Sequence, residues 1–486
     1  MNASRQRLSL AMIEKSKIRI IVGCVDSQIV GIYPHKEISD ALSYAMQGAY
    51  FSKAFKEKRW DGRIRLLQRN KFPTGCLDIV EAILIEQGRE YEVEDLRPLQ
   101  EHEPSAFKLP GVSMRPYQIM MIARMLEAMT GYISVATGGG KTLIAAALIK
   151  GICQPSAFLV HNTMLFDQTI EVFERCFGAE NVGRFRGGQE DIKPVTVFMV
   201  QALRSHIGNK LNCPMLDQFR VMIVDECHHV ASNGQKAQWY QVARRFKNAP
   251  FRFGMTATPQ KKRWKILMHA ALGKEIAVKT VSELQSEGYL SETDCIFYRI
   301  NVPDIFTTKY ADAYNRGIVE NVVRNEYAVR QAIKQAREKK IVLLMVDKVA
   351  HGAILKDHLD HAGSGLNTVF LWGAWTKSKK KRTELAAVKQ DIKDRKIDIV
   401  IATRGLVGEG VDIPVIDCIV NVAGGKSDIT FRQMFGRGLR IAEDKEELTY
   451  IDFVDEQNMH LYDHSHSRIS ECKKMKQKVS IRLMEN

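Results

Sequence analysis

Short apolar runs that end in polar or glycine-rich turns recur along the chain from about residue 113. The first of them are YISV, SAFLV, VTVFMV, VMIV and FRFGM, with segments of helical spacing such as LIAAALIKGI between them. The alternation repeats in KIVLLMV, NTVFL, IDIVIAT, DCIVNVA and TYIDFV. Short apolar runs that alternate with helices are typical of parallel strands covered on both faces. The pattern therefore predicts two tandem α/β units, each a doubly wound parallel sheet.

The pattern of charged and apolar residues before and after these two units differs from the pattern within them. The first hundred residues mix charged positions with short strand-like runs such as IRIIVGCV, and a proline-bearing stretch follows. We therefore expect a small basic α+β domain over 1–105, α/β units over 106–290 and 291–455, and a basic C-terminal tail over 456–486. A length of 486 residues agrees with several domains.

Charge and cysteine usage narrow the class of protein. The formal net charge is +15, which indicates a polyanion such as nucleic acid as a partner. No apolar run is long enough to span a membrane, and the N-terminus lacks the pattern of a secretory signal. The nine cysteines include no C-x-x-C pair, which favours a reducing compartment over a disulfide framework. We expect a cytoplasmic protein without a membrane partner.

The stretch VATGGGKT resembles a phosphate loop, although Val135 stands where the pattern G-x-x-x-x-G-K-[ST] has its first glycine. Successive glycines let backbone N–H groups approach phosphate oxygens, and the N-terminus of the following helix favours negative charge. The pattern assigns Lys141 to the β and γ phosphates of a nucleotide and the Thr142 hydroxyl to Mg²⁺. The predicted cofactor-binding residues of this turn are Thr137, Gly138, Gly139, Gly140, Lys141 and Thr142.

A pair of carboxylates follows the apolar run VMIV. Because the run predicts a buried strand, Asp225 and Glu226 should emerge at its tip. At a phosphate site Asp225 would hold Mg²⁺, and Glu226 would orient and deprotonate the attacking water. An ordinary acidic pair at a strand end is the alternative.

Several stretches in this order resemble the motifs of superfamily 2 helicases. They are RPYQ, VATGGGKT, FLVHNTMLFDQ, TVFMVQAL, DECHH, GMTATP, ATRGLVGEGVDIP and QMFGRGLR, and they span about 113–455. The resemblance implies two RecA-like domains that bind and hydrolyse ATP. It implies that RPYQ reads adenine, with Arg115 and Gln118 at the nucleotide. It also implies that the strand of a nucleic acid contacts His161, Gln201, Thr256 and Thr403.

The second unit would complete the ATP site. Gln433, Arg437 and Arg440 fall at i, i+4 and i+7, so one helical face presents them together. The resemblance assigns the two arginines to charge that develops on the γ-phosphate. It also implies that Asp412 senses the nucleotide and that Gly408 allows close backbone approach.

The predicted front domain carries a basic segment with interleaved aromatics, FSKAFKEKRWDGRIRLLQRNKFPTG. Cations with aromatics suit backbone tracking and base stacking, so we expect Trp60, Arg63 and Arg65 to contact DNA. A solvated face with packed aromatics is the alternative. WDG also resembles the front domain of UvsW-type phage helicases, which remodel branched DNA. That resemblance implies a DNA helicase of replication, recombination and repair that acts on single-stranded, forked or branched DNA.

We expect a monomer, with replication or recombination proteins as further partners. Three other functions stay open on the sequence. They are an RNA helicase, the motor subunit of a restriction-type translocase, and a nucleic-acid clamp without ATPase activity. The intact Lys141, Asp225, Glu226 and Arg437 argue against the clamp.

Overall fold

The computed structural model describes residues 17–46, 48–98, 107–208, 213–231, 238–257, 265–376, 379–408, 415–425, 439 and 447–484. The chain divides into two compact units. One consists of Met1–Val135 and Gly140–Val278, and the other of Ala136–Gly139 and Lys279–Asn486. Each unit is described below by itself.

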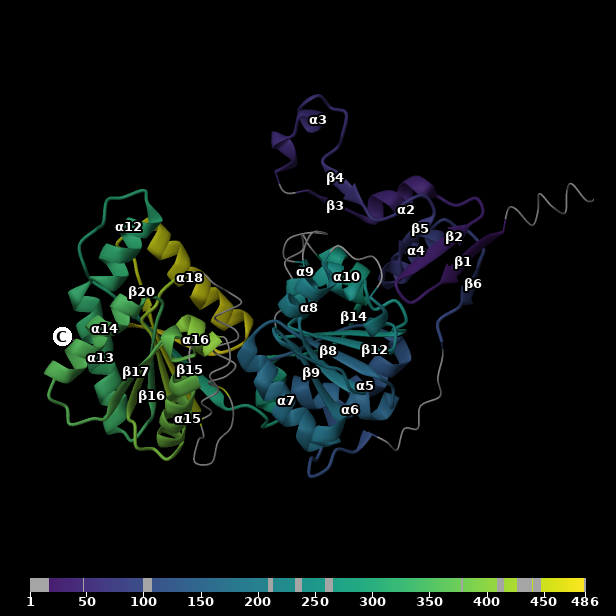
Figure 1. Ribbon diagram of the computed structural model, residues 1–486. Coiled ribbons are helices and arrows are strands. Elements are labelled where there is room, and N and C mark those ends of the chain that lie inside the picture. The colour runs from purple at the N-terminus through teal and green to yellow at the C-terminus, as the bar shows by residue number, and fades with distance from the viewer. Residues whose placement is uncertain are drawn as a thin grey trace, which may run out of the picture. The chain divides into compact units, whose positions relative to one another are not determined.

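The first unit begins with a four-stranded sheet in the order β5-β2-β1-β6. Its strands and helices are β1 (Ile18–Val22), β2 (Asp26–Val30), β5 (Lys71–Pro73), β6 (Tyr91–Asp95), α2 (His35–Ala41) and α4 (Leu77–Glu86). Alternate residues of β1, namely Ile18, Ile20 and Val22, are buried, as expected for a sheet with one covered face. The two-stranded ribbon of β3 (Ser43–Ala45) and β4 (Arg63–Arg65) carries α3 (Lys53–Lys56) beside this sheet (Figure 1).

An eight-stranded sheet follows in the order β10-β9-β11-β8-β12-β13-β7-β14. The strands are β7 (Thr130–Val135), β8 (Ser156–Val160), β9 (Val182–Arg186), β10 (Gln189–Asp191), β11 (Val195–Met199), β12 (Val221–Asp225), β13 (Phe251–Thr256) and β14 (Glu275–Lys279). Helices α5 (Pro116–Ala128), α6 (Lys141–Ile152) and α7 (Thr163–Phe177) lie on one face (Figure 1). Helices α8 (Val200–Ile207), α9 (Gln238–Ala243) and α10 (Lys265–Leu272) lie on the other (Figure 1). The central strands are buried along their whole length, as two-sided cover requires.

The front sheet and the larger sheet of this unit share one hydrophobic core. A single cluster of buried side chains runs from Ile18 of β1 to Trp239 of α9 and Leu272 of α10. Polar contacts cross the same boundary. Arg244 donates two hydrogen bonds to the Asp26 carboxylate, at 2.7 and 2.9 Å, and His269 Nε2 lies 2.7 Å from Asp78 Oδ1. The front sheet is therefore built into the first unit.

Gly75, beside the start of α4, is a point of close backbone approach across this boundary. A Cβ atom there would lie 2.1 Å from the backbone oxygen of His269 and 2.9 Å from the backbone nitrogen of Gly273. Backbone cannot yield as a flexible side chain can, so Gly75→Ala should lower the free energy of unfolding by about 1–3 kcal/mol. Urea unfolding measures this change. Gly187→Ala is the control, because a Cβ atom at Gly187 meets nothing within 4 Å. Equal stability of the two variants would contradict the prediction.

The second unit is built on a seven-stranded sheet in the order β17-β18-β16-β19-β20-β15-β21. Its strands are β15 (Glu292–Arg299), β16 (Val342–Val346), β17 (Thr368–Leu371), β18 (Ile399–Thr403), β19 (Cys418–Asn421), β20 (Glu447–Val454) and β21 (Lys478–Leu483). All their registered pairs are parallel. The helices are α11 (Val281–Ser286), α12 (Tyr310–Tyr314), α13 (Val322–Arg337), α14 (Val349–His361), α15 (Lys379–Lys393), α16 (Arg404–Gly408) and α18 (Met459–Lys474).

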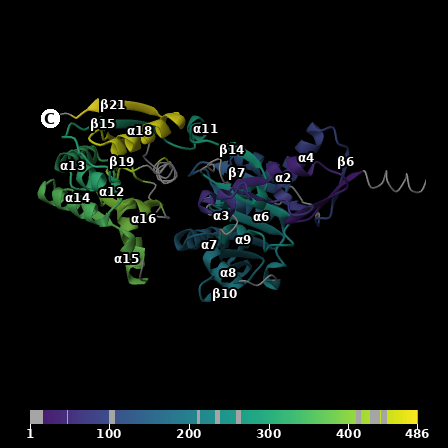
Figure 2. The ribbon, with the colours of Figure 1, turned by 90° about the horizontal axis from the view of Figure 1, so that it is seen from above.

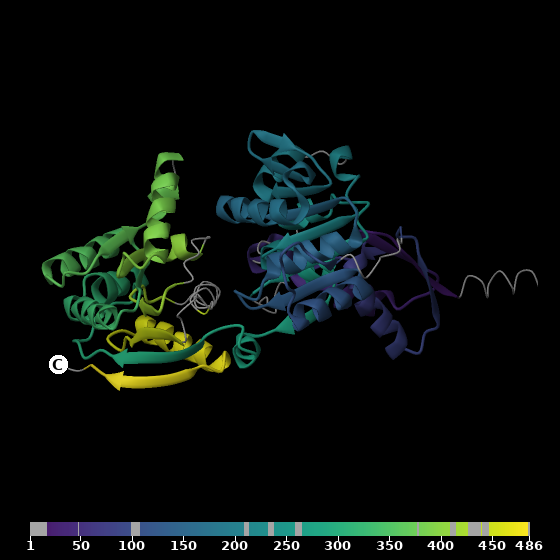
Figure 3. The same cartoon turned by 90° about the horizontal axis from the view of Figure 1, so that it is seen from below.

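The C-terminal segment differs from the predicted tail. Residues 459–474 form helix α18, which packs on β20 and β21, and β21 lies alongside β15 in the sheet (Figures 2 and 3). The basic residues that suggested a tail include Lys473 and Lys474 at the end of α18 and Lys478 at the start of β21. Their apolar neighbours, such as Leu461, Ile469 and Cys472, are buried. The segment is thus an integral part of the second unit.

A buried charge cluster joins α18 to the strands of the second unit. Arg468 donates hydrogen bonds to both carboxylate oxygens of Asp452, at 2.8 and 2.9 Å. Tyr450 Oη and Asn421 Nδ2 also donate to Asp452, at 2.6 and 2.9 Å. Because Asp452 is 0% exposed, these donors replace the water that its charge would otherwise have.

The predicted fold class is confirmed: each unit is a doubly wound α/β sheet, and the front sheet is small and mixed. The division between the units lies at Val278 and Lys279, twelve residues before the expected boundary at 290. Among the described residues, no helix has both the length and the apolar character needed to cross a membrane.

Candidate active site

Five parallel strands of the first unit bring the predicted ATP-site residues to one edge of the sheet. The order β11-β8-β12-β13-β7 is parallel throughout, so the carboxyl ends of these strands lie together. Ligand sites of doubly wound sheets form at this edge. The residues of this unit that end or follow these strands are Gln201, His161, Asp225, Thr256 and, at the end of the turn after β7, Gly140.

The phosphate loop lies between β7 and α6. Val135 is the last residue of β7 and is 0% exposed, so it occupies a strand position and the loop begins after it. Gly140 precedes Lys141, the first residue of α6, and has a φ of +76°, which side chains with a Cβ rarely adopt. A Cβ atom at Gly140 would also lie 2.5 Å from Gln118 Nε2. The loop therefore requires glycine at this position.

Gln118 and Arg115 stand at the start of α5. Gln118 is 2% exposed, and its Oε1 accepts a hydrogen bond from the backbone N–H of Arg115 at 2.9 Å. The structure thus places Gln118 against Gly140 of the phosphate loop, where the sequence predicts a nucleotide-binding residue. Its part in reading adenine stays a prediction.

The two carboxylates leave the tip of β12, as predicted. Asp225 ends the strand, and its Oδ1 accepts a hydrogen bond from the backbone N–H of Glu226 at 2.9 Å. Glu226 has a φ of +48°, a left-handed conformation that costs a residue other than glycine about 1–2 kcal/mol. Strained residues of this kind cluster at functional sites. The turn aims Glu226 at the loop, where its Oε1 lies 3.8 Å from Lys141 Nζ.

The two carboxyl groups have opposite pKa shifts. Burial, together with the negative charge of Glu226, raises the pKa of Asp225 above its ordinary value. Burial acts on Glu226 in the same direction, but the charge of Lys141 and the contact with His228 outweigh it and lower the pKa of Glu226. Glu226 is therefore the more firmly ionised of the two. A divalent cation would relieve the unfavourable charge on Asp225.

His228 connects Glu226 to the neighbouring strand. Its Nδ1 lies 3.2 Å from Glu226 Oε2 and 3.1 Å from Thr256 Oγ1, at the end of β13. Thr256 is 0% exposed. Because Thr256 is buried and contacts His228, it is better placed to connect Glu226 with β13 than to contact a nucleic-acid strand directly. The sequence did not assign His228 this role, although its place two residues after Glu226 was a usable signal.

A cluster of rings extends the site towards α9. The ring of His229 lies 4.6 Å from that of His161 and stacks on Trp239 at 6.1 Å. Burial and the neighbouring histidines lower the pKa of His229 to about 3, so its ring is neutral at physiological pH. Gln201 Nε2 donates a hydrogen bond to the backbone oxygen of His161 at 2.7 Å. His161 and Gln201, both predicted to contact DNA, are thus held together beside the carboxylates.

In the second unit, the described residues include only part of the predicted set. Thr403 ends β18 and is 8% exposed, and Gly408 ends α16. Asp412, Gln433, Arg437 and Arg440 lie outside the described residues, and their roles stay predictions. Arg404, not singled out from the sequence, lies with its Nε 3.4 Å from Asp347 Oδ1.

The front ribbon holds the three predicted DNA contacts of the front domain. Trp60 Nε1 donates a hydrogen bond to the backbone oxygen of Arg63 at 2.8 Å, and Arg63 Nε donates to Ser43 Oγ at 2.8 Å. Arg65 is paired with Asp61 and Asp40, at 2.7 and 3.1 Å, so its charge is balanced locally. Arg63 and Arg65 occupy alternate positions of β4 and share one face, as expected.

The site geometry suits a nucleotide with Mg²⁺. The glycine turn and the N-terminus of α6 offer N–H groups to phosphates, and Lys141 supplies a positive charge beside them. Thr142 and Asp225 stay the predicted oxygen ligands of Mg²⁺, a cation that prefers oxygen.

Comparisons with known proteins agree with this geometry. Residues 111–261 match the family described as type III restriction enzyme, res subunit, and residues 325–442 match the helicase conserved C-terminal domain. Together the two matches cover more than half of the chain. The first match includes the phosphate loop and the two carboxylates, and the second includes the QMFGRGLR motif.

Individual proteins are similar over longer stretches. The ATP-dependent DNA helicase uvsW of Enterobacteria phage T4 is 24% identical over 450 residues, 86% of each chain. The DNA 3'-5' helicase XPB of Kineococcus radiotolerans is 25% identical over 244 residues, 48% of this chain and 42% of that protein.

Among solved structures, the ATP-dependent type ISP restriction-modification enzyme LlaBIII bound to DNA has a TM-score of 0.57 at 13% identity. That likeness covers 84% of this chain and 36% of the other, and it shows the shared fold. The motifs, both family matches and the ATP-dependent helicase relatives lead to one assignment. This chain belongs to superfamily 2 of the helicases and is an ATP-hydrolysing enzyme of that class.

Proposed function

We propose that this helicase acts on DNA and uses ATP hydrolysis to unwind or branch-migrate forked and junction DNA. The observation that carries the proposal is the extent of the likeness to the T4 DNA helicase. It covers 86% of each chain, whereas the two family matches lie within 111–442. The shared stretch is therefore longer than the motor regions, which are common to helicases of many substrates.

The described residues of the first unit support a chemical role for Lys141 and for Glu226. In this structure Lys141 is 3.8 Å from Glu226, so a γ-phosphate would compete with that carboxylate for the lysine. Glu226, once released, accepts a proton from the attacking water. Mg²⁺ held by Thr142 and Asp225 would neutralise charge on the phosphates.

The same geometry offers a route from the ATP site to the substrate site. His228 contacts both Glu226 and Thr256, and the adjacent His229 stacks on Trp239 of α9. A change at the γ-phosphate would move Glu226 first and these contacts with it. Arg437 and Arg440 of the second unit would complete the site in the ATP-bound state, and the alternation of states would drive movement along DNA.

A substrate panel tests the proposal. Purified protein is mixed with single strands, blunt duplex, forks, four-way junctions and RNA duplexes of the same sequence, with ATP and without it. We expect ATP-dependent resolution of forks and junctions in preference to blunt duplex, with little action on RNA. Equal action on RNA duplexes would instead indicate an RNA helicase, and ATP-dependent movement on blunt duplex without unwinding would indicate a restriction-type translocase.

A further inference from the structure

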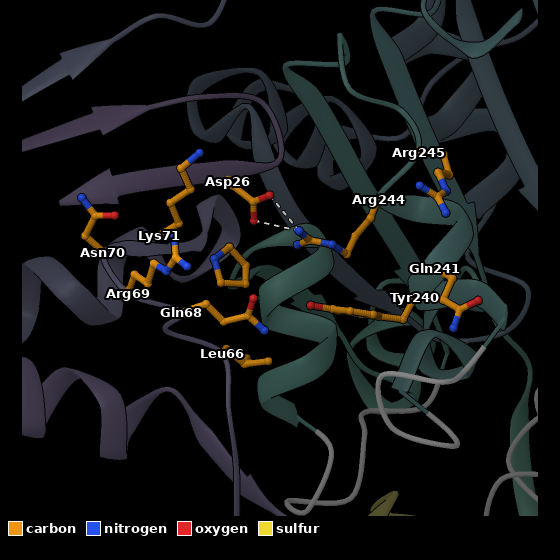
Figure 4. Close-up of a pocket in the computed structure, with 11 residues that line it drawn as sticks. Asp26, Leu66, Gln68, Arg69, Asn70, Lys71, Tyr240, Gln241, Arg244 and Arg245 are labelled. Atoms are coloured by element: carbon orange, nitrogen blue, oxygen red, sulfur yellow. Dashed lines mark hydrogen bonds and ion pairs between the residues drawn. The ribbon is translucent and has the colours of Figure 1, made fainter. Parts of the chain in front are cut away.

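A basic pocket of about 750 Å³ lies in the first unit, between the front sheet and α9 (Figure 4). One wall is the turn that joins β4 to β5, with Arg69 and Lys71. The other is the end of α9 with Arg244 and Arg245, and Asp26 of β2 lies between the walls. The lining therefore contains four cationic side chains and one carboxylate, and Arg244 pairs with that carboxylate. This pocket lies apart from the phosphate loop and the carboxylates, none of which lines it.

The β4–β5 turn is held rigidly. Gln68 and Lys71 exchange backbone hydrogen bonds at 2.9 and 3.0 Å, which closes a two-residue turn over Arg69 and Asn70. Arg69 has a φ of +57°, and its backbone oxygen accepts a hydrogen bond from Tyr33 Oη at 3.1 Å. The side chains of Arg69 and Lys71 are exposed, so the fixed backbone presents two positive charges to solvent at the rim of the pocket.

The opposite wall is fixed as well. Arg244 lies over the buried ring of Tyr240, with its guanidinium carbon 5.9 Å from the ring centre. It donates two hydrogen bonds to Asp26, and its side chain is 32% exposed. A guanidinium that is partly exposed and already oriented can take a second oxygen ligand, because it has five N–H donors.

Phosphate is the ligand chemistry that matches these walls. Arginine and lysine bind phosphate oxygens, and the exposed Arg69 and Lys71 add positive charge beside a lining carboxylate that already pairs with Arg244. The aromatic ring of the pocket, Tyr240, is 5% exposed, so it offers no face on which a base could stack. The lining thus suits a phosphodiester backbone and reads no sequence.

We infer that this pocket binds the phosphate backbone of duplex DNA and so anchors one arm of the substrate to the first unit. The inference rests on the proposed action on DNA and adds a site to it. Because α9 carries both Trp239, which stacks on His229, and the pocket wall, DNA bound here would also contact the helix that borders the ATP site.

The test compares equilibrium binding of a short blunt DNA duplex to the full chain over salt concentrations of about 50 to 200 mM. Arg69→Ala with Lys71→Ala should weaken binding about five- to tenfold and lower the slope of log affinity against log salt by about 2. Asp26→Asn should act in the opposite direction and tighten binding, since it removes the carboxylate that competes for Arg244. A role of these residues in folding alone would not produce effects of opposite sign.

The control is Lys36→Ala with Arg89→Ala. Lys36 lies in α2 and Arg89 between α4 and β6; both are exposed cations outside the pocket, so the change in net charge is the same. An equal loss of affinity in the control, or Asp26→Asn that weakens binding, would overturn the inference. If the Arg69→Ala, Lys71→Ala variant lost affinity for inorganic pyrophosphate but bound the duplex as tightly as the wild type, the pocket would be a site for a small phosphate ligand, and the inference would be overturned. Failure of the wild type to act on forked DNA, by contrast, would refute the proposed function itself.

Discussion

Glu226→Gln is expected to reduce ATP hydrolysis by about 100- to 10,000-fold while ATP binding is kept or becomes tighter. The amide cannot accept a proton from the attacking water. It also removes the negative charge that lies 3.8 Å from Lys141 Nζ, so the lysine is freed for the phosphates. Steady-state phosphate release gives the rate, and titration with a fluorescent ATP analogue gives the affinity.

Lys141→Ala is the matched contrast to this variant. It should lose affinity for ATP as well as hydrolysis, because the positive charge beside the phosphate loop is gone. Both variants should keep the unfolding midpoint of the wild type to within a few degrees. If Glu226→Gln hydrolysed ATP within a few-fold of the wild-type rate, Glu226 would not be the group that accepts the proton.

Arg468→Met is expected to destabilise the second unit by about 3–5 kcal/mol, because it leaves the buried carboxylate of Asp452 without its cationic partner. Asp452 is 0% exposed and Arg468 is 4% exposed, so water cannot replace the lost guanidinium without opening the packing of α18. Native domains are stable by only about 5–15 kcal/mol, so the loss is a large part of the total. Urea unfolding followed by tryptophan fluorescence measures it, with Trp372 and Trp375 as reporters in this unit.

A second substitution separates loss of charge balance from loss of packing. Arg468→Met combined with Asp452→Asn removes both charges, and the amide can still accept hydrogen bonds from Tyr450 and Asn421. The double variant should recover at least half of the lost stability. If it were no more stable than Arg468→Met alone, the effect would come from packing around α18 and not from the unpaired carboxylate.

The two α/β units and the ATP-site residues of the first unit were predictable because each rests on local pattern. Apolar runs marked the buried strands, and the residues that follow them, such as Lys141 and Glu226, reach one edge because parallel strands end together. Val135 shows the limit of motif matching. It looked like a missing loop glycine, yet it is the buried last residue of β7.

What the sequence did not provide depends on contacts between distant segments. The residues of β21 read as a basic tail because a sheet edge leaves some side chains exposed, and only the pairing with β15 shows that the segment is a strand. His228 and Thr256 are 28 residues apart, and their contact follows from the adjacency of β12 and β13. Local pattern does not contain that order of strands.

The shared core of the front sheet and the larger sheet decides how this protein can be shortened. A chain that began after the front sheet would expose part of the common cluster, including the side of α10 that packs on residues Thr74–Cys76. Contiguous exposed apolar surface of this kind promotes aggregation. A lower DNA affinity after deletion of the front segment could therefore come either from lost contacts of the proposed DNA site or from aggregation. Substitutions at exposed positions such as Lys71 change the proposed DNA-binding surface and leave the core intact.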